Sequence, residues 1–98
     1  MDSPHLTGAQ KTKLRGLGQT LSDSLRIGRQ GPTPALYLEL NRQLDARELV
    51  KLRFEGAERG ERADLCARIA AEAPCVCIGA VGHTALFWRR PAAGSKLL

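Results

Sequence analysis

The feature that most constrains the fold is a repeated change of hydrophobic period along the chain. Apolar residues recur every three or four positions between residues 14 and 21, as on one face of a helix. Val50, Leu52 and Phe54 instead alternate with charged residues, as in a strand with one buried face. Such switching within 98 residues predicts a single α/β domain in which helices pack on a sheet.

Capping and turn residues divide the chain into seven expected elements. Thr7 and Thr33 are good helix caps, Pro34 suits the first helical position, and Pro74 ends a helix. We expect helices at about residues 7–21, 34–44 and 61–73, and strands at about 24–28, 48–55, 75–80 and 84–89. The order is α-β-α-β-α-β-β, with three helices and a four-stranded mixed sheet. The strand at 75–80 is apolar on both faces, which predicts a central position.

The polar ends of the chain are expected to lie outside the fold, with a disordered lead at 1–6, one domain at 7–91 and a flexible tail at 92–98. Cys75 and Cys77 have a spacing that suits neither a zinc knuckle nor a disulfide, so with Cys66 they are interpreted as buried, reduced thiols. No signal peptide fits the N-terminus, and no apolar run approaches about 20 residues. These features together predict a cytoplasmic protein.

Positive charge is unevenly distributed. The chain has 15 Lys and Arg against 10 acidic residues, a net charge of +5. Residues 11–31 carry a net +4 and residues 83–98 a net +3, whereas residues 32–82 carry a net −1. Segregated positive charge suits a polyanion such as nucleic acid. On charge alone, a solvated basic surface explains the pattern equally well.

The sharpest motif is Gly28-Arg29-Gln30-Gly31, which lies between an expected strand and a capped helix. Glycine leaves room for an approaching phosphate, Arg29 offers a charged fork, and Gln30 is a further donor. Taken alone, the motif favours a plain tight turn, because Gly-x-x-Gly is a short pattern. Pro32 and Pro34 lack N–H groups, which weakens the helix end as an anion site.

Other basic residues flank this loop in the predicted fold. Lys11 and Arg15 lie one turn apart on the first helix, and Lys51 and Arg53 lie on the outer face of a strand. Arg89 follows Trp88, which either stacks on a base or fills the core. The core position is favoured, because the chain has few other large apolar residues.

Catalytic and metal-binding patterns are not evident. His5 lies in the lead and His83 in a turn, without a neighbouring nucleophile, and no phosphate-binding loop or zinc helix is found. The sequence therefore predicts a binding module that uses no cofactor or metal, and not an enzyme.

Four segments, in order, resemble the CRM domain (chloroplast RNA splicing and ribosome maturation) in its bacterial stand-alone YhbY-like form. They are residues 7–21, 27–33, 48–53 and 81–89, and the resemblance extends over residues 6–91. It implies a fold similar to the C-terminal domain of translation initiation factor three. It also implies RNA binding through the Gly-x-x-Gly loop, and association with pre-50S ribosomal particles. Two positions depart from the family pattern, His83 in place of a frequent Lys or Arg, and Pro32 in place of an apolar residue.

The resulting hypothesis is a monomeric, non-enzymatic protein that binds ribosomal RNA during assembly of the large subunit. An adaptor that docks its basic face on an acidic or ribosomal protein is the alternative, and a small enzyme acting on phosphorylated ligands ranks last. The RNA-binding residues would be Gly28, Arg29, Gln30 and Gly31, flanked by Lys11, Arg15, Lys51, Arg53 and Arg89.

Overall fold

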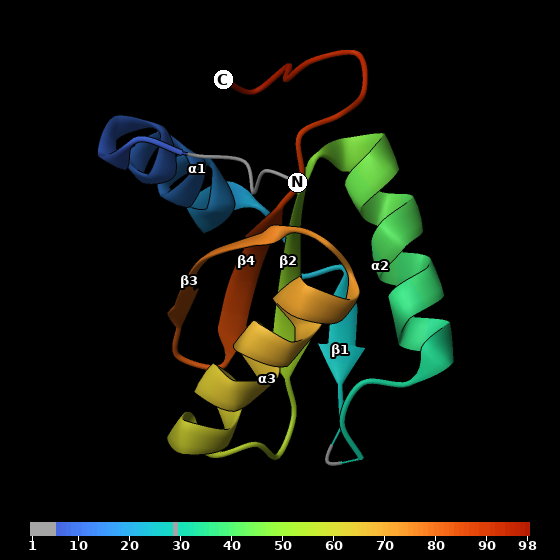
Figure 1. Cartoon of the computed structure of the whole chain (residues 1–98). Coiled ribbons are helices and arrows are strands. Elements are labelled where there is room, and N and C mark those ends of the chain that lie inside the picture. The colour runs from blue at the N-terminus through green and yellow to red at the C-terminus, as the bar shows by residue number, and fades with distance from the viewer. Residues whose placement is uncertain (1–5, 29) are drawn as a thin grey trace.

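A computed structural model describes residues 6–28 and 30–98. Within these residues three helices and four strands alternate as expected (Figure 1). The sheet order is β1-β2-β4-β3; β1 and β2 are parallel, and the other pairs are antiparallel. The predicted α/β class and mixed sheet are confirmed. The elements are α1 (Gly8–Thr20), β1 (Leu25–Ile27), α2 (Pro34–Arg47), β2 (Leu49–Phe54), α3 (Arg59–Glu72), β3 (Val76–Val81) and β4 (Thr84–Trp88).

The first two helices begin where their caps predict. The Thr7 hydroxyl accepts from the backbone N–H of Gln10 (3.1 Å), and the Gln10 side chain accepts from the N–H of Thr7 (3.0 Å). The Thr33 hydroxyl accepts from the N–H of Leu36 (3.1 Å), with Pro34 opening α2. This helix continues to Arg47, beyond its expected end at residue 44, because Glu48 supplies the positive φ of 73° that ends it.

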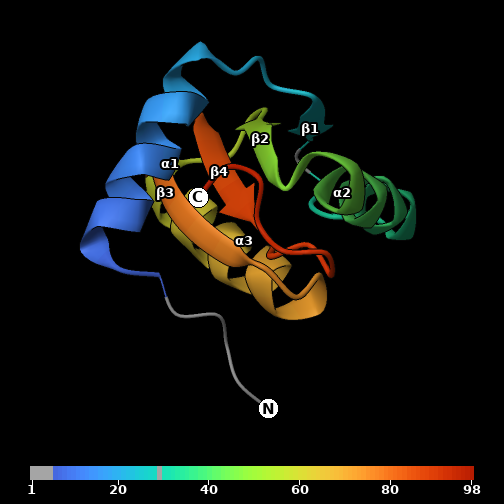
Figure 2. The same cartoon turned by 90° about the horizontal axis from the view of Figure 1, so that it is seen from above.

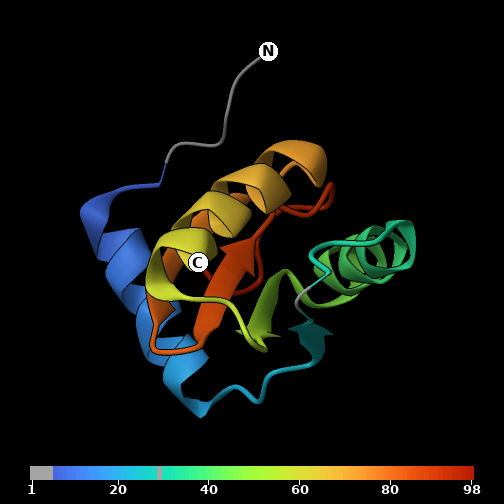
Figure 3. The ribbon, with the colours of Figure 1, turned by 90° about the horizontal axis from the view of Figure 1, so that it is seen from below.

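The apolar residues form two clusters, one on each face of the sheet. Helices α2 and α3 cover one face, and α1 covers the other (Figures 2 and 3). Alternation along β2 places Val50, Leu52 and Phe54 in the larger cluster and Leu49 in the smaller one. The larger cluster contains Ile27, Leu40, Leu44, Val50, Leu52, Phe54, Cys66, Ile69, Ala73, Ala85 and Phe87, and the smaller one contains Leu14, Leu49, Ile78, Leu86 and Trp88.

The position of β3 corrects one expectation. We expected this strand to be central because it is apolar on both faces, yet it lies at the edge of the sheet, beside β4 alone. Helices α1 and α3 both pack against it, so each of its faces meets apolar side chains without a second neighbouring strand. A strand covered on both faces has the same apolar pattern whether it is central or at an edge.

Trp88 is a core residue, as favoured from the sequence. Its side chain is fully buried, and its Nε1–H donates to the Glu48 carboxylate (2.8 Å). The same carboxylate accepts from the Ser95 hydroxyl and from the backbone N–H of Lys96 (2.9 Å). Burial acts to raise the pKa of Glu48, but these hydrogen bonds, led by that of Ser95, hold its pKa below the ordinary value.

The ends of the described chain are packed against the smaller cluster. Residues 92–98 were expected to form a flexible tail, but they fold back to the Glu48 carboxylate, with Leu97 and Leu98 on the smaller cluster. Leu6, assigned to the lead, packs there as well. The rest of the lead and Arg29 lie outside the described residues. Among the described helices, none combines the length and apolar character required to span a membrane.

Candidate functional site

Three loops gather at one end of the sheet, because β4 runs antiparallel to β1 and β2. They are residues 28 and 30–33, residues 55–58, and the turn between β3 and β4 (Figure 1). The N–H of Glu55 donates to the carbonyl of Ile27 (2.7 Å), and the N–H of Phe54 donates to the carbonyl of His83 (2.7 Å). The predicted Gly-x-x-Gly loop therefore adjoins the end of β2, which in turn adjoins the hairpin turn.

The two glycines of this loop differ in backbone conformation and in whether a side chain could replace their hydrogen. Gly31 has a φ of 82°, and its N–H donates to the carbonyl of Gly28 (3.1 Å). A side chain at position 31 would be strained, whereas Gly28 is exposed with open space around it. At the start of α2 the Leu36 N–H is already bonded to Thr33. The helix end thus offers few free donors, and an anion must be held mainly by loop residues and side chains.

A groove of about 610 Å³ runs between the loop and α3, and its chemistry is mostly acidic. Among the described residues that line it, three carboxylates and Arg68 lie on the α3 side, facing Gly28, Gln30 and Gly31. The position of these acidic residues beside the loop was not predicted from the sequence. Like charge disfavours a phosphate on this side. The carboxylates belong to Glu58, Glu61 and Asp64.

On the opposite face of the sheet, which α1 covers, two basic side chains lie in a row that crosses the strands near the loop. Strand pairing places Arg26 beside Arg53, Arg53 beside Thr84, and Thr84 beside Val81. Paired residues lie on the same face of a sheet, so the row crosses all four strands. Asp23 lies between the two arginines, 3.9 Å from Arg26 Nε and 3.6 Å from Arg53 Nε. Arg26 was not predicted as a site residue, although alternation with Leu25 and Ile27 already directed it outward.

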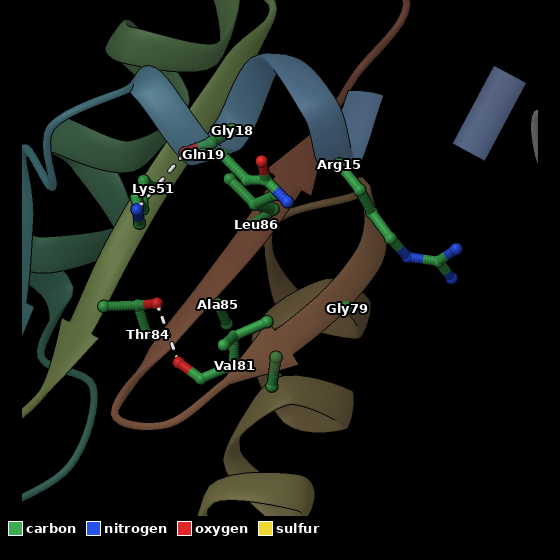
Figure 4. A pocket seen from close by; sticks show the side chains of 10 residues that line it. Arg15, Gly18, Gln19, Lys51, Gly79, Val81, Thr84, Ala85 and Leu86 are labelled. Carbon is green, nitrogen blue, oxygen red and sulfur yellow. Dashed lines mark hydrogen bonds between the residues drawn. The ribbon is translucent and has the colours of Figure 1, made fainter. Parts of the chain in front are cut away.

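A second cavity, of about 340 Å³, lies between α1 and the sheet (Figure 4). Strand pairing aligns Lys51, Leu86 and Gly79 in a second row on the same face as Arg53. Gly18 packs against Leu86 so closely that a Cβ at this position would overlap its side chain. This contact shows that Gly18 serves close packing of helix on sheet. The cavity is lined by Arg15, Gly18, Gln19, Lys51, Gly79, Ala80, Val81, Thr84, Ala85 and Leu86.

The cations of this cavity are held by backbone carbonyls. Lys51 Nζ donates to the carbonyl of Gly18 (3.2 Å), and Arg15 Nη2 donates to the carbonyl of Ile78 (3.4 Å). In the part of the chain that the structure describes, no carboxylate lines the cavity or pairs with either cation. Lys11 lies one turn before Arg15 on α1. Four predicted basic residues, on α1 and β2, are thus collected on one face.

Arg89 lies apart from this group, near the opposite end of the sheet. Its Nε donates to the carbonyl of Pro74 (2.8 Å), and its Nη1 donates to Asp45 (3.2 Å). Its Nη2 donates to the side-chain oxygen of Asn41. These contacts join α2, β4 and the start of β3 and give Arg89 a structural role. A contact between Arg89 and RNA stays a prediction.

The hairpin turn has a cation despite the histidine at position 83. Arg62 Nη1 lies 3.2 Å from His83 Nδ1 and also donates to the carbonyl of Ala57 (2.9 Å). The guanidinium therefore lies at the turn, where the family pattern often has Lys or Arg. The sequence did not indicate this pairing, because it joins residues 21 positions apart on α3 and the turn.

The three cysteines are free thiols, as expected. Cys66 is buried as predicted, whereas Cys75 and Cys77 are only half-buried. Burial raises the pKa of Cys75 to about 12. Hydrogen bonding to Cys77, together with burial, raises the pKa of the Cys66 thiol. In the described part of the chain, no cluster of three His, Cys, Asp or Glu side chains has metal-binding geometry.

The sequence and the fold are similar to those of known proteins. The family model for the CRS1 / YhbY (CRM) domain matches residues 6–89. A Pseudomonas aeruginosa protein named as a probable RNA-binding protein is 31% identical over 85 residues, covering 87% of this chain and 82% of the relative. A Haemophilus influenzae RNA-binding protein is 27% identical over 84 residues, covering 86% and 85%. A Staphylococcus aureus protein solved in solution has the same fold, with a TM-score of 0.79, 22% identity, and coverage of 88% and 90%.

Proposed function

Because the chain belongs to the CRS1 / YhbY (CRM) domain family, we propose that it is a non-enzymatic RNA-binding protein. The observation that carries the proposal is the basic face formed by α1 and β2, which leads to the Gly-x-x-Gly loop. Arg15 and Lys51 lie at one end of this face, and Arg26 and Arg53 continue it across the sheet. Phosphate oxygens would bind these side chains, and Arg29 and Gln30 would contact the backbone at the loop.

The charge on the two sides of the loop favours one direction of approach. The groove toward α3 is lined by three carboxylates, whereas the α1 face carries four basic side chains, Arg15, Lys51, Arg26 and Arg53. Asp23 and Glu55 pair with the last two and offset part of their charge. An RNA backbone that follows the α1 face avoids the repulsion from Glu58, Glu61 and Asp64. Gly28 and Gly31 then allow close approach at the end of this path.

The finer proposal is that the RNA is large-subunit ribosomal RNA in pre-50S particles, bound by a monomer in the cytoplasm. Its support is the resemblance to stand-alone bacterial CRM proteins, which are associated with such particles. Free thiols at positions 66, 75 and 77 suit a reducing compartment. Few groups on the basic face read base edges, so RNA shape and charge should matter more than sequence.

A titration of a labelled ribosomal RNA fragment over a range of salt concentrations tests RNA binding. Affinity should fall with a log–log slope of roughly 0.7–0.9 per phosphate neutralised. Arg53→Glu should weaken binding and lower that slope by about one. Arg42→Glu is the matched control, because Arg42 is also exposed and paired with a carboxylate but lies on α2, away from the basic face. A slope near zero, or equal effects of both variants, would refute the electrostatic account.

Two further measurements test separately the role of the loop and the association with pre-50S particles. Arg29→Glu should reduce RNA affinity; unchanged affinity would mean that the loop is not the RNA clamp and would favour the adaptor. Sedimentation of a cell lysate should place the protein with pre-50S particles. If it stays with small soluble proteins while the purified protein still binds RNA, the ribosomal assignment fails and RNA binding stands.

A further inference from the structure

The cavity between α1 and the sheet combines apolar side chains of the sheet with two cations that have no carboxylate partner among the described residues. Arg15 and Lys51 donate to backbone carbonyls, whereas Arg26, Arg53 and Arg89 pair with carboxylates. Among residues 6–28 and 30–98, no carboxylate lines this cavity. A ligand that fits it therefore has an anionic group beside a largely apolar body.

The shape of the cavity limits the size of that body. Its volume of about 340 Å³ is at the lower end of the range of about 300–1,000 Å³ for small-molecule sites. Leu86 and Val81 belong to the sheet side, and Val81 is 81% exposed. Gln19 lies on the helix side, and its amide can donate to and accept from a base edge. Figure 4 shows Gln19 on α1 above the sheet and Arg15 extending toward Gly79.

We propose that this cavity binds one unstacked nucleotide of the RNA. The base lies against Leu86 and Val81, and Gln19 contacts its edge. Lys51 and Arg15 lie on opposite sides of the cavity, because β4 separates β2 from β3, so each holds one of the two phosphates that flank the nucleotide. The proposal rests on the proposed RNA binding and adds a preference for RNA with an unpaired base, such as a bulge. Bases extruded from a helix are commonly recognised by contact with their flat faces, including contact with guanidinium planes.

The location of the cavity supports a nucleotide as its occupant. Thr84 lines the cavity and pairs with Arg53, the next residue in the basic row. An RNA backbone that follows this row from the Gly-x-x-Gly loop reaches the mouth of the cavity at Thr84 and Val81. The Thr84 hydroxyl donates to the carbonyl of Val81 (3.0 Å), which leaves its oxygen lone pairs as acceptors at this mouth.

Two hairpin RNAs that differ by one base test the proposal. Both carry a single-nucleotide bulge, with a uracil in one RNA and an abasic sugar in the other, so that their charge is equal. The wild-type protein should bind the RNA with the base about fivefold or more tightly, since a hydrogen bond from Gln19 to the base edge contributes roughly that much. Gly79→Val should abolish the preference. A Cβ at Gly79 makes only ordinary contact with Arg15 Nε (3.4 Å), and the added methyl groups occupy the cavity.

Gly60→Val is the control, because Gly60 lies on α3 with no atom within 4 Å of an added Cβ. It should keep the preference. If Gly79→Val does not fold, methyl NMR of the wild-type protein gives the answer in its place. The Val81 and Leu86 signals should differ between the complexes with the two RNAs, whereas Leu38, which is exposed on α2, should not.

The outcomes separate this proposal from the proposed function. Equal affinity for both RNAs, with identical Val81 and Leu86 signals, would overturn the nucleotide cavity and leave RNA binding intact. Absence of binding to either hairpin and to ribosomal RNA would remove the proposed function itself. Loss of the preference in Gly60→Val as well as in Gly79→Val would also refute the assignment to the cavity.

Discussion

Replacing Glu48 by alanine should be one of the most destabilising substitutions in the protein. The Nε1–H of Trp88, which is fully buried, would lose its acceptor at 2.8 Å, and a buried unpaired donor costs about 1–3 kcal/mol. The hydrogen bonds from Ser95 and Lys96 are partly buried and contribute about 0.5–1.5 kcal/mol each. The expected total is about 2–6 kcal/mol.

Alanine is the appropriate replacement because it keeps a Cβ at the positive φ of residue 48. Backbone strain is therefore unchanged, and the difference reports the carboxylate. For a domain of this size the loss corresponds to a decrease in Tm of about 10–30 °C. Urea unfolding and thermal melts followed by circular dichroism would measure it.

A double-mutant cycle with Trp88→Phe identifies the source of the loss. Phenylalanine removes the indole donor, so the two substitutions together should cost less than the sum of the single effects, by about 1 kcal/mol or more. Strict additivity would refute the Trp88 contribution. A loss below about 1 kcal/mol for Glu48→Ala would refute the importance of the carboxylate as a whole.

Three other predictions concern pH, the loop glycines and Arg89. The pKa of Glu48 is lowered in the folded state, so the carboxylate stabilises the fold above the ordinary glutamate pKa, and this stabilisation is lost as pH falls through the lowered value. Thermal melts from about pH 7 to about pH 3 should therefore show a smaller acid-induced loss of stability in Glu48→Gln than in the wild type. Gly31→Ala should cost about 1–2 kcal/mol in urea unfolding because of its φ of 82°, whereas Gly28→Ala should cost little, and equal losses would contradict this difference. Arg89→Ala should cost about 1–3 kcal/mol because three acceptors lose their donor; a loss no larger than that of Arg42→Ala, an exposed pair within one helix, would argue against its structural role.

The parts of the fold that depend on local signals were predictable from the sequence. Thr7 and Thr33 act on residues two or three positions away, so their capping roles are written in short segments. Alternation in residues 49–54 placed Lys51 and Arg53 on the face opposite Phe54 for the same reason. Strand order is different, because an apolar strand at an edge, covered by helices on both faces, has the pattern of a central one.

In the candidate site as well, local motifs were predictable from the sequence, whereas contacts between distant residues were not. Gly28 and Gly31 were found as a motif, but the acidic groove beside them depends on how α3 packs after a chain reversal. The cavity depends on the close contact between Gly18 and Leu86, which are 68 positions apart in the sequence. Gly18 lies within α1, and no residue near it in the sequence indicates that Leu86 is its partner. The contacts of residues 92–98 likewise require Glu48, a residue far earlier in the chain.

The separation of the apolar residues into two clusters has a consequence for how such a protein can diversify. The larger cluster, under α2 and α3, is isolated by the sheet from the face that contains the cavity and the basic rows. Replacement of cavity residues such as Gln19 or Val81 alters only the neighbourhood of α1. New ligand preferences can therefore be selected on one side of the sheet while the opposite side continues to maintain the fold.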